Sequence, residues 1–258
     1  MALLILRFTL APLTIFIATM VQRRWGHESG GRVVGLPLTT GPFLVLVALI
    51  DGPASTSTAA HGVVAGQVAV ILFCATYAHL ARRIRPLLAV PGSLAVALVG
   101  VALLSQVRYP LVVLAVVLGV AALAITTWPA AFGDAGDEPE PLPWELPVRL
   151  AAAGLIVGTL TVITSVVTPF VAGTLATMPV ILSVLAPTTH IRSGIDAASS
   201  LLRGTVRSVP GNLMFASVVS WLIQPLGWIA FVLGLGALVV MDRSLTMISR
   251  RRANSPTR

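Results

Sequence analysis

The chain has 258 residues, of which 56% are apolar and 10% are charged, and its mean hydropathy is +0.94. A water-soluble domain of this size normally carries about a quarter charged residues, so the composition excludes a soluble globular fold. The net charge is +8 and all 17 basic residues are arginine. These arginines fall between apolar stretches rather than along one surface, which argues against nucleic-acid binding. The single cysteine, Cys74, excludes a disulfide framework and a thiolate metal site.

Long apolar runs predict about nine transmembrane helices, because about 20 apolar residues cross the hydrocarbon core of a bilayer. In chain order, the predicted helices cover residues 3–21, 33–50, 60–80, 86–104, 109–128, 147–166, 168–187, 204–223 and 226–241. The chain is therefore expected to be an all-α, polytopic transmembrane helix bundle whose immediate partner is the lipid bilayer.

The arginines also predict an orientation, since cytoplasmic loops hold an excess of basic residues. With the N-terminus outside and the C-terminus in the cytoplasm, every arginine except Arg7 and Arg108 falls on the cytoplasmic side. Residues 129–146 are acidic and proline-rich, and we expect them to form a cytoplasmic linker. Residues 242–258 form a basic tail that is expected to bind anionic lipids.

The segments on the two sides of this linker are weakly similar to each other. A shift of 142 residues places Gly52 on Gly194 and Gly62 on Gly204. We therefore predict two repeats: residues 1–128 hold the first, with four helices and an extra fifth, and residues 147–241 hold the second. An odd number of helices separates the starts of the two units. The second unit is therefore expected to have inverted topology, as in many secondary transporters.

The second and seventh predicted helices each contain glycine or proline near mid-length. Gly41-Pro42 and Met178-Pro179 are expected to kink or unwind them, because proline lacks an amide donor and clashes with the preceding turn. Freed backbone groups cannot face lipid, so we expect them to line a cavity. The alternative is that each proline only bends its helix for packing. The substrate-binding residues predicted in these segments are Pro37, Thr39, Thr40, Gly41, Pro42, Thr174, Thr177 and Pro179.

Three polar residues inside other predicted helices complete the candidate site. Arg207 is placed about one turn inside the membrane and is a candidate gate or substrate contact. Gln67 and Asn212 are further candidates for substrate binding. The alternative for Arg207 is that its side chain extends to the cytoplasmic headgroups.

We do not expect an enzyme. His190, Ser193 and Asp196 lie in one short segment without a nucleophile-elbow sequence, which argues against a hydrolase triad. Asp196 is expected to form an ion pair with Arg192 instead. The histidines have no metal-ligand spacing and there is no nucleotide-binding motif, so neither a metal nor another cofactor is expected.

The segments GLPLTTGP and LATMPV, followed by THIRSG and LLRG, resemble those of little-characterised bacterial inner-membrane proteins with two related halves. They are distantly similar to the small GlpM-like membrane proteins. The resemblance covers residues 5–82 and 147–224. It implies a location in the bacterial cytoplasmic (inner) membrane and supplies no substrate. In the interrupted helices, a local shift of 137 residues aligns Thr40-Gly41-Pro42 with Thr177-Met178-Pro179. This shift places Pro37 opposite Thr174 and Gly41 opposite Met178, so the two interruptions differ.

Two functions remain open from the sequence. The first is a small inverted-repeat transporter or permease for a small polar or anionic substrate, because paired interrupted helices are typical of transporter sites. The second is a non-transporting assembly or scaffold subunit for envelope or lipid synthesis. GxxxG patterns such as GRVVG and GVVAG allow close approach of helices and are compatible with a homodimer.

Overall fold

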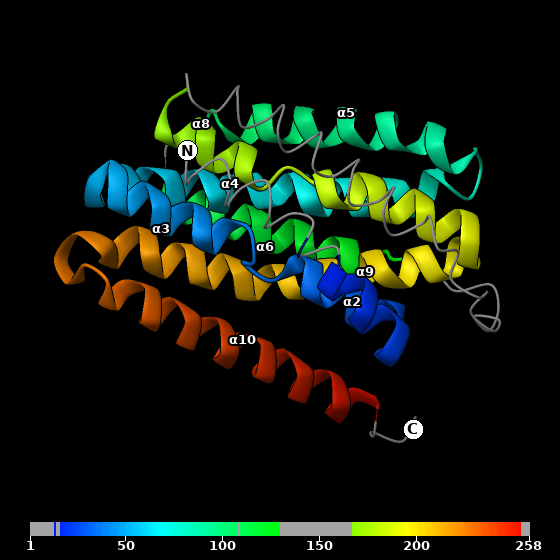
Figure 1. The fold of residues 1–258 in the computed structure, drawn as a ribbon. Coiled ribbons are helices and arrows are strands. Elements are labelled where there is room, and N and C mark those ends of the chain that lie inside the picture. Colours follow the sequence, from blue (N-terminus) through cyan, green and yellow to red (C-terminus); the bar gives the residue numbers. More distant parts are fainter. Residues whose placement is uncertain (1–12, 14–15, 108, 130–166, 254–258) are drawn as a thin grey trace.

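The computed structural model describes residues 13, 16–107, 109–129 and 167–253, whose regular structure is entirely helical (Figure 1). Residues 16–25 are helical, and the helices that follow are α2 (His27–Gly35), α3 (Thr40–Ile50), α4 (Gly52–Leu80), α5 (Pro86–Leu104), α6 (Pro110–Thr126), α8 (Pro169–Ala176), α9 (Val180–Leu226) and α10 (Ile229–Ala253). The predicted all-α class is confirmed. The predicted helix 147–166, most of the helix 3–21 and nearly all of the linker 129–146 lie outside the described residues.

Five of the described helical stretches are apolar and long enough to cross a membrane, which is compatible with a membrane protein. They are His27–Ile50, Gly52–Leu80, Pro86–Leu104, Pro169–Leu226 and Ile229–Met247, and α6 is a shorter apolar helix. The stretch Pro169–Leu226 has 58 residues, too many for one crossing, and it turns back on itself (Figure 1). Nine separate crossing helices are not seen in the part of the chain that the structure describes.

Two glycines reverse the direction of the chain at matching places. Gly52, between α3 and α4, has a φ of 79°, and Gly194, within α9, has a φ of 84°. This left-handed region is open to glycine but costly for residues with a Cβ atom. Gly194 divides α9 into α9a (residues 180–193) and α9b (residues 195–226). The two turns are 142 residues apart, which is the shift that aligns the two halves of the sequence.

The predicted start of a helix is confirmed where a proline lies in its first turn. α5 covers residues 86–104 as predicted, and Pro86 starts it. The helices predicted to begin at residues 60 and 204 begin instead directly after the glycine turns. The sequence after Gly52 is rich in serine and threonine, which lowers its hydropathy. These hydroxyls can bond within the helix: Thr56 Oγ1 donates to the Gly52 carbonyl oxygen at 2.8 Å.

α4 and α9b form the centre of the bundle and run antiparallel (Figure 1). Toward one end, Ser57 and Ser220 each donate a hydroxyl hydrogen bond to the other's carbonyl oxygen, at 2.7 and 2.9 Å. Toward the opposite end, an Arg82 nitrogen lies 3.8 Å from an Asp196 carboxylate oxygen. These contacts fix the register of the two central helices over their full shared length.

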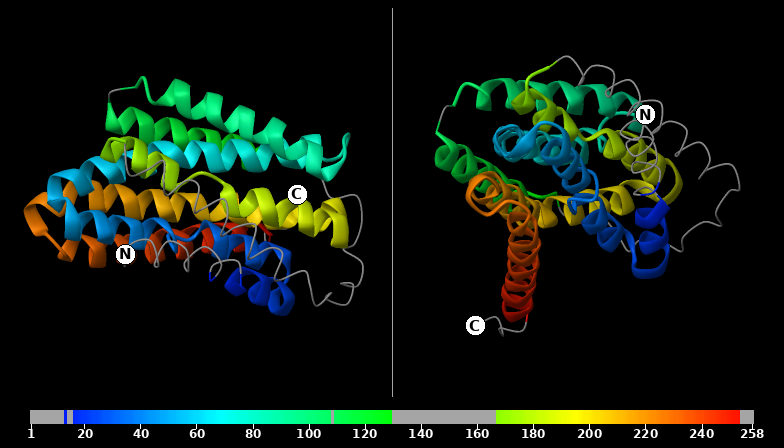
Figure 2. Two further views of the ribbon diagram at one scale, coloured as in Figure 1. Left: turned by 45° about the horizontal axis from the view of Figure 1, so that its top comes forward. Right: turned by 60° about the vertical axis from the view of Figure 1, so that its left-hand side comes forward.

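α5 and α10 lie at the periphery. The most apolar window of α4 is 72% buried, whereas the corresponding windows of α5 and of Ile229–Met247 are 22% buried. Figure 2 shows α10 diverging from the rest of the bundle toward the C-terminus. Large apolar side chains such as Leu103 and Val232 are exposed there. Surfaces of this kind suit contact with lipid.

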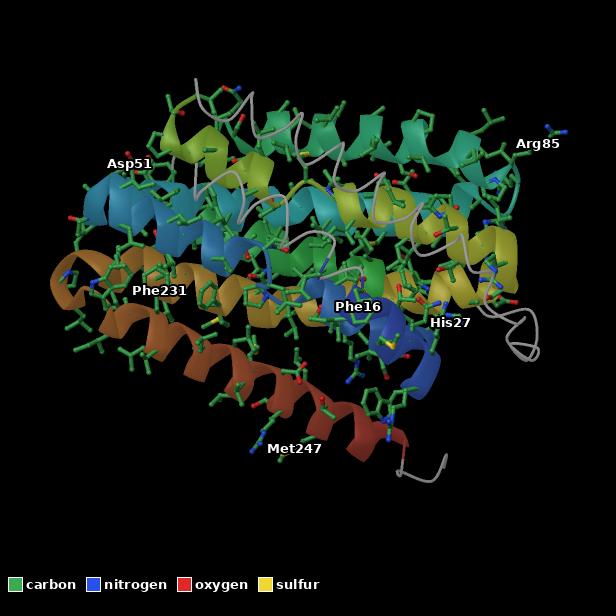
Figure 3. The ribbon with its side chains drawn as sticks, in the orientation of Figure 1. Phe16, His27, Asp51, Arg85, Phe231 and Met247 are labelled. Carbon is green, nitrogen blue, oxygen red and sulfur yellow. The ribbon has the colours of Figure 1, made fainter. Side chains whose placement is uncertain are left out.

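The two ends of the bundle differ in charge. Arg85 and His27 lie at one end and Asp51 lies at the other (Figure 3). The first end also holds the adjacent turns that contribute Arg82 and Asp196. This is the end that the arginine distribution predicts to face the cytoplasm.

Candidate functional site

The first helix interruption separates α2 from α3. α2 ends at Gly35, and Leu36 is extended, with φ −69° and ψ 157°, because a following proline disfavours helical backbone. Pro37 therefore causes this break, whereas the sequence assigned it to Gly41-Pro42. Pro42 lies within the first turn of α3, where a missing amide donor removes no helical hydrogen bond.

The second interruption separates α8 from α9. α8 ends at Ala176 and α9 begins at Val180, so that residues 177–179 break the helix at the predicted Met178-Pro179. The Met178 carbonyl oxygen accepts a hydrogen bond from the Val180 amide at 2.7 Å, which is a tight local turn. Both breaks fall near the middle of the bundle's length (Figure 1).

The two breaks face one another across a single small cavity of about 60 Å³. One wall comes from the first break and includes Leu36, Thr39 and Thr40. The opposite wall comes from the second break and includes Thr177 and Pro179. This volume is enough for a few water molecules or a small solute, since one water needs about 10–15 Å³ of such space.

Side-chain amides from the two central helices complete the lining. Gln67 from α4 and Asn212 from α9b line the cavity and are almost fully buried, at 2% and 5% exposure. Asn212 Oδ1 and Thr40 Oγ1 have no hydrogen-bond partner among the described residues. A buried polar atom left without a partner costs about 1–3 kcal/mol, so these groups favour occupation by water or a polar solute.

The cavity contains helix ends of both polarities and no ionisable side chain. The first turns of α3 and α9, which carry partial positive charge, reach it through Thr40 and Ile181. The last turns of α2 and α8, which carry partial negative charge, reach it through Gly35 and Ala176. The site therefore offers both donors and acceptors to a small polar molecule without placing a formal charge beside it.

Six of the predicted site residues surround this cavity, and five do not line it. The lining residues are Thr39, Thr40, Gln67, Thr177, Pro179 and Asn212. The residues outside the lining are Pro37, Gly41, Pro42, Thr174 and Arg207. Thr174 serves to fix α8 on α4, because its hydroxyl is 3.2 Å from the Gly62 carbonyl oxygen.

Arg207 is held away from the cavity by an acidic partner. Its guanidinium forms an ion pair with Glu28 of α2, whose carboxylate also lies 3.1 Å from Arg32. The sequence reasoning missed Glu28, although its position four residues before Arg32 is a recognisable helix ion-pair spacing. Asp196, expected to pair with Arg192, also lies beside Arg82, whose nitrogen is 3.8 Å from its carboxylate.

The short helices that carry the breaks pack on the central helices through matching glycine contacts. A side chain at Gly31 of α2 would collide with the backbone of Leu201 and Thr205 in α9b. A side chain at Gly173 of α8 would collide with the backbone of Ala59 and Val63 in α4. Each residue of the second set is 142 positions from a residue of the first set. The two contacts therefore have the same geometry at related positions of the chain.

Comparison with other proteins adds no assignment. No protein-family model matches the chain, and no curated protein or solved structure matches it significantly. The resemblance to two-repeat inner-membrane proteins remains a prediction from the sequence. Among the described residues, no group of histidine, cysteine, aspartate or glutamate side chains is arranged to hold a metal ion.

Proposed function

We propose that the protein is a membrane transporter or permease for a small polar or anionic solute, which binds in the cavity between the two helix breaks. The observation that carries this proposal is the convergence of both breaks, far apart in sequence, on one small, partly open cavity whose lining includes buried side-chain groups without hydrogen-bond partners among the described residues. Backbone that leaves a helix inside a membrane is tolerated only where protein or a water-filled cavity meets its polar groups. Transporter sites are commonly built in this way.

Two inverted repeats are part of the proposal. The matching glycine contacts at a shift of 142 residues support a relation between the α2–α4 segment and the α8–α9 segment. The antiparallel packing of α4 and α9b supports opposite orientations for the two units. In this scheme the breaks lie close to the axis that relates the repeats, at the proposed midplane of the inner membrane, and the arginine-rich end faces the cytoplasm.

The lining limits the class of solute and the mechanism. The cavity volume of about 60 Å³ suits a molecule of a few non-hydrogen atoms. No carboxylate or histidine lines the cavity, so proton transfer through its lining side chains is not part of the proposal. Selection would rest on hydroxyls, amides and backbone groups, which bind neutral polar molecules and small monovalent anions.

Permeability of reconstituted liposomes tests this proposal. We expect stopped-flow light scattering to show faster entry of at least one small probe, among urea, glycerol, formate and nitrate, than in empty liposomes. Asn212→Leu and Gln67→Leu keep side-chain size but remove polar groups, and should slow entry about tenfold, the effect of losing a buried hydrogen bond of about 1.4 kcal/mol. Thr126→Val, at an exposed hydroxyl, is the matched control and should have no effect.

Two results would overturn the proposal. The first is a wild-type protein that passes every probe no faster than empty liposomes. The second is equal permeability in the wild type and both cavity variants, with all proteins correctly folded. A protein that passes no probe but purifies with one stoichiometric partner would support the assembly or scaffold function instead.

A further inference from the structure

A second and larger cavity lies beside α8, toward the end of the bundle where α4 begins. Its volume is about 390 Å³, and α4, α6, α8 and the segment between α5 and α6 form its walls. Along α4, His61 and Ala65 line this cavity, whereas Gln67 lines the central one. Ala65 and Gln67 are two residues apart, about 200° around the helix, so the two cavities lie on nearly opposite sides of α4, and α8 packs against α4 beside both of them.

His61 is the polar group best placed to meet a solute in this cavity. Its Nδ1 atom lies 3.1 Å from the carbonyl oxygen of Ser57 and 2.8 Å from the hydroxyl of Ser220. We assign the proton of the neutral ring to Nδ1, because a carbonyl oxygen only accepts hydrogen bonds and the Ser220 hydroxyl already donates to Ser57. The Nε2 atom, which is buried without a partner, is then free to accept a hydrogen bond. Thr58 and Ser105 add hydroxyl groups to otherwise apolar walls.

The matching place in the other half of the chain holds an ion pair. The shift of 142 residues relates Phe170, which lines the His61 cavity, to Glu28, and it relates Ala65 to Arg207. In both halves the first of these residues packs against a glycine of a central helix: Phe170 against Gly62 and Glu28 against Gly204. In one half of the chain, Phe170 and Ala65 therefore line a largely apolar cavity. In the other half, the related residues Glu28 and Arg207 form an ion pair.

We propose that the His61 cavity is the access site through which the solute reaches the central cavity, and that the Glu28–Arg207 ion pair closes the equivalent access site on the opposite face. This inference rests on the proposed function. It implies that the described conformation is open at the His61 cavity, toward the end of the bundle where α4 begins. The acceptor at His61 Nε2 narrows the proposed solute class to small polar molecules that carry a hydrogen-bond donor, such as urea or glycerol. The breaks at residues 36–39 and 177–179 allow α2 and α8 to move separately from α3 and α9a.

Cysteine accessibility in proteoliposomes tests the assignment without requiring a known substrate. The natural Cys74 is fully buried and is first replaced, as Cys74→Ala. Val64→Cys places a thiol in the His61 cavity, and Val206→Cys places one at the related position beside Arg207. A membrane-impermeant methanethiosulfonate is the probe. We expect Val64→Cys to react about tenfold faster than Val206→Cys, reflecting the population of the open conformation.

Neutralising the ion pair should reverse this preference. Glu28→Gln is expected to speed labelling at Val206→Cys and slow it at Val64→Cys, each by about tenfold, because it weakens closure of one face only. Asp196→Asn removes the carboxylate of another ion pair between helices and is the matched control that should change neither rate.

Equal labelling of the two cysteines, or an unchanged ratio after Glu28→Gln in a folded protein, would overturn this inference. Permeability of the cavity variants is measured separately. If the protein passes a probe but Glu28→Gln leaves the labelling ratio unchanged, the access assignment alone is rejected. If Glu28→Gln reverses the labelling ratio but the protein passes no probe, the transport proposal is rejected.

Discussion

Replacing Gly173 by alanine tests how closely the break-carrying helices must approach the central helices. A Cβ atom at this position would overlap the carbonyl oxygen of Ala59 and approach the amide nitrogen of Val63. Both are backbone atoms of α4, so no side-chain rotation can relieve the overlap, and α8 must move. Overpacking of this kind costs about 1–3 kcal/mol. Alanine also gains about 1 kcal/mol in helix propensity over glycine, which partly hides the loss.

A matched substitution separates these two effects. Gly119 of α6 has no atom within 4 Å of an added Cβ, so Gly119→Ala gains propensity without overlap. The free energy of unfolding of each variant can be measured by SDS titration in mixed micelles with tryptophan fluorescence. We expect Gly173→Ala to be about 1–3 kcal/mol less stable than Gly119→Ala. Gly31→Ala should show a similar difference, because Leu201 and Thr205 oppose it in the same way. A difference below about 0.5 kcal/mol for Gly173→Ala would refute the packing argument.

Other predictions concern single polar groups and use the same unfolding assay. The hydroxyl of Tyr77 is buried without a partner among the described residues, so Tyr77→Phe should leave the free energy of unfolding unchanged or raise it by about 1 kcal/mol; a loss of that size would contradict the observed environment. Ser57→Ala and Ser220→Ala should each lower the free energy of unfolding by about 1 kcal/mol, because each removes one of two reciprocal bonds between α4 and α9b. The loss of unfolding free energy in the double variant should differ from the sum of the two single losses, since the two residues are in contact. Ser244→Ala, at an exposed hydroxyl, is the control and should have no effect.

The sequence predicts those features that depend on local backbone chemistry. Glycines 142 residues apart predicted related units, and two of them, Gly52 and Gly194, form matching turns with left-handed backbone. The second break lies at Met178-Pro179, where the proline predicted it. The first break moved from Gly41-Pro42 to the segment after Gly35, because a proline in the first turn of a helix is tolerated and only the preceding Pro37 interrupts it.

Features that depend on tertiary pairing could not be predicted in the same way. Arg207 was expected near a substrate because it lay inside an apolar stretch, but Glu28, 179 residues away in sequence, pairs with it. Hydropathy also underestimated α4, since the serines and threonines after Gly52 lower the average while bonding to their own helix. The partner of Arg207 is supplied by tertiary folding and leaves no periodic signal in the sequence, whereas the hydroxyl bonds of α4 are local and are missed only because average hydropathy ignores them.

The helix breaks join binding to movement. A continuous helix satisfies its own backbone and offers a solute little, whereas a broken one exposes donors and acceptors that must be met by something else. Interruption also removes the rigid connection between the two parts of the helix, and in the proposed access mechanism this lets α8 shift on α4 while α9a stays in place. In this proposal, the backbone geometry that gives the cavity its affinity for a solute is the same geometry that lets its walls move. Glu28 and Arg207 pair with each other outside the cavity lining. In the proposed mechanism this pair favours one arrangement without placing a charge beside the solute.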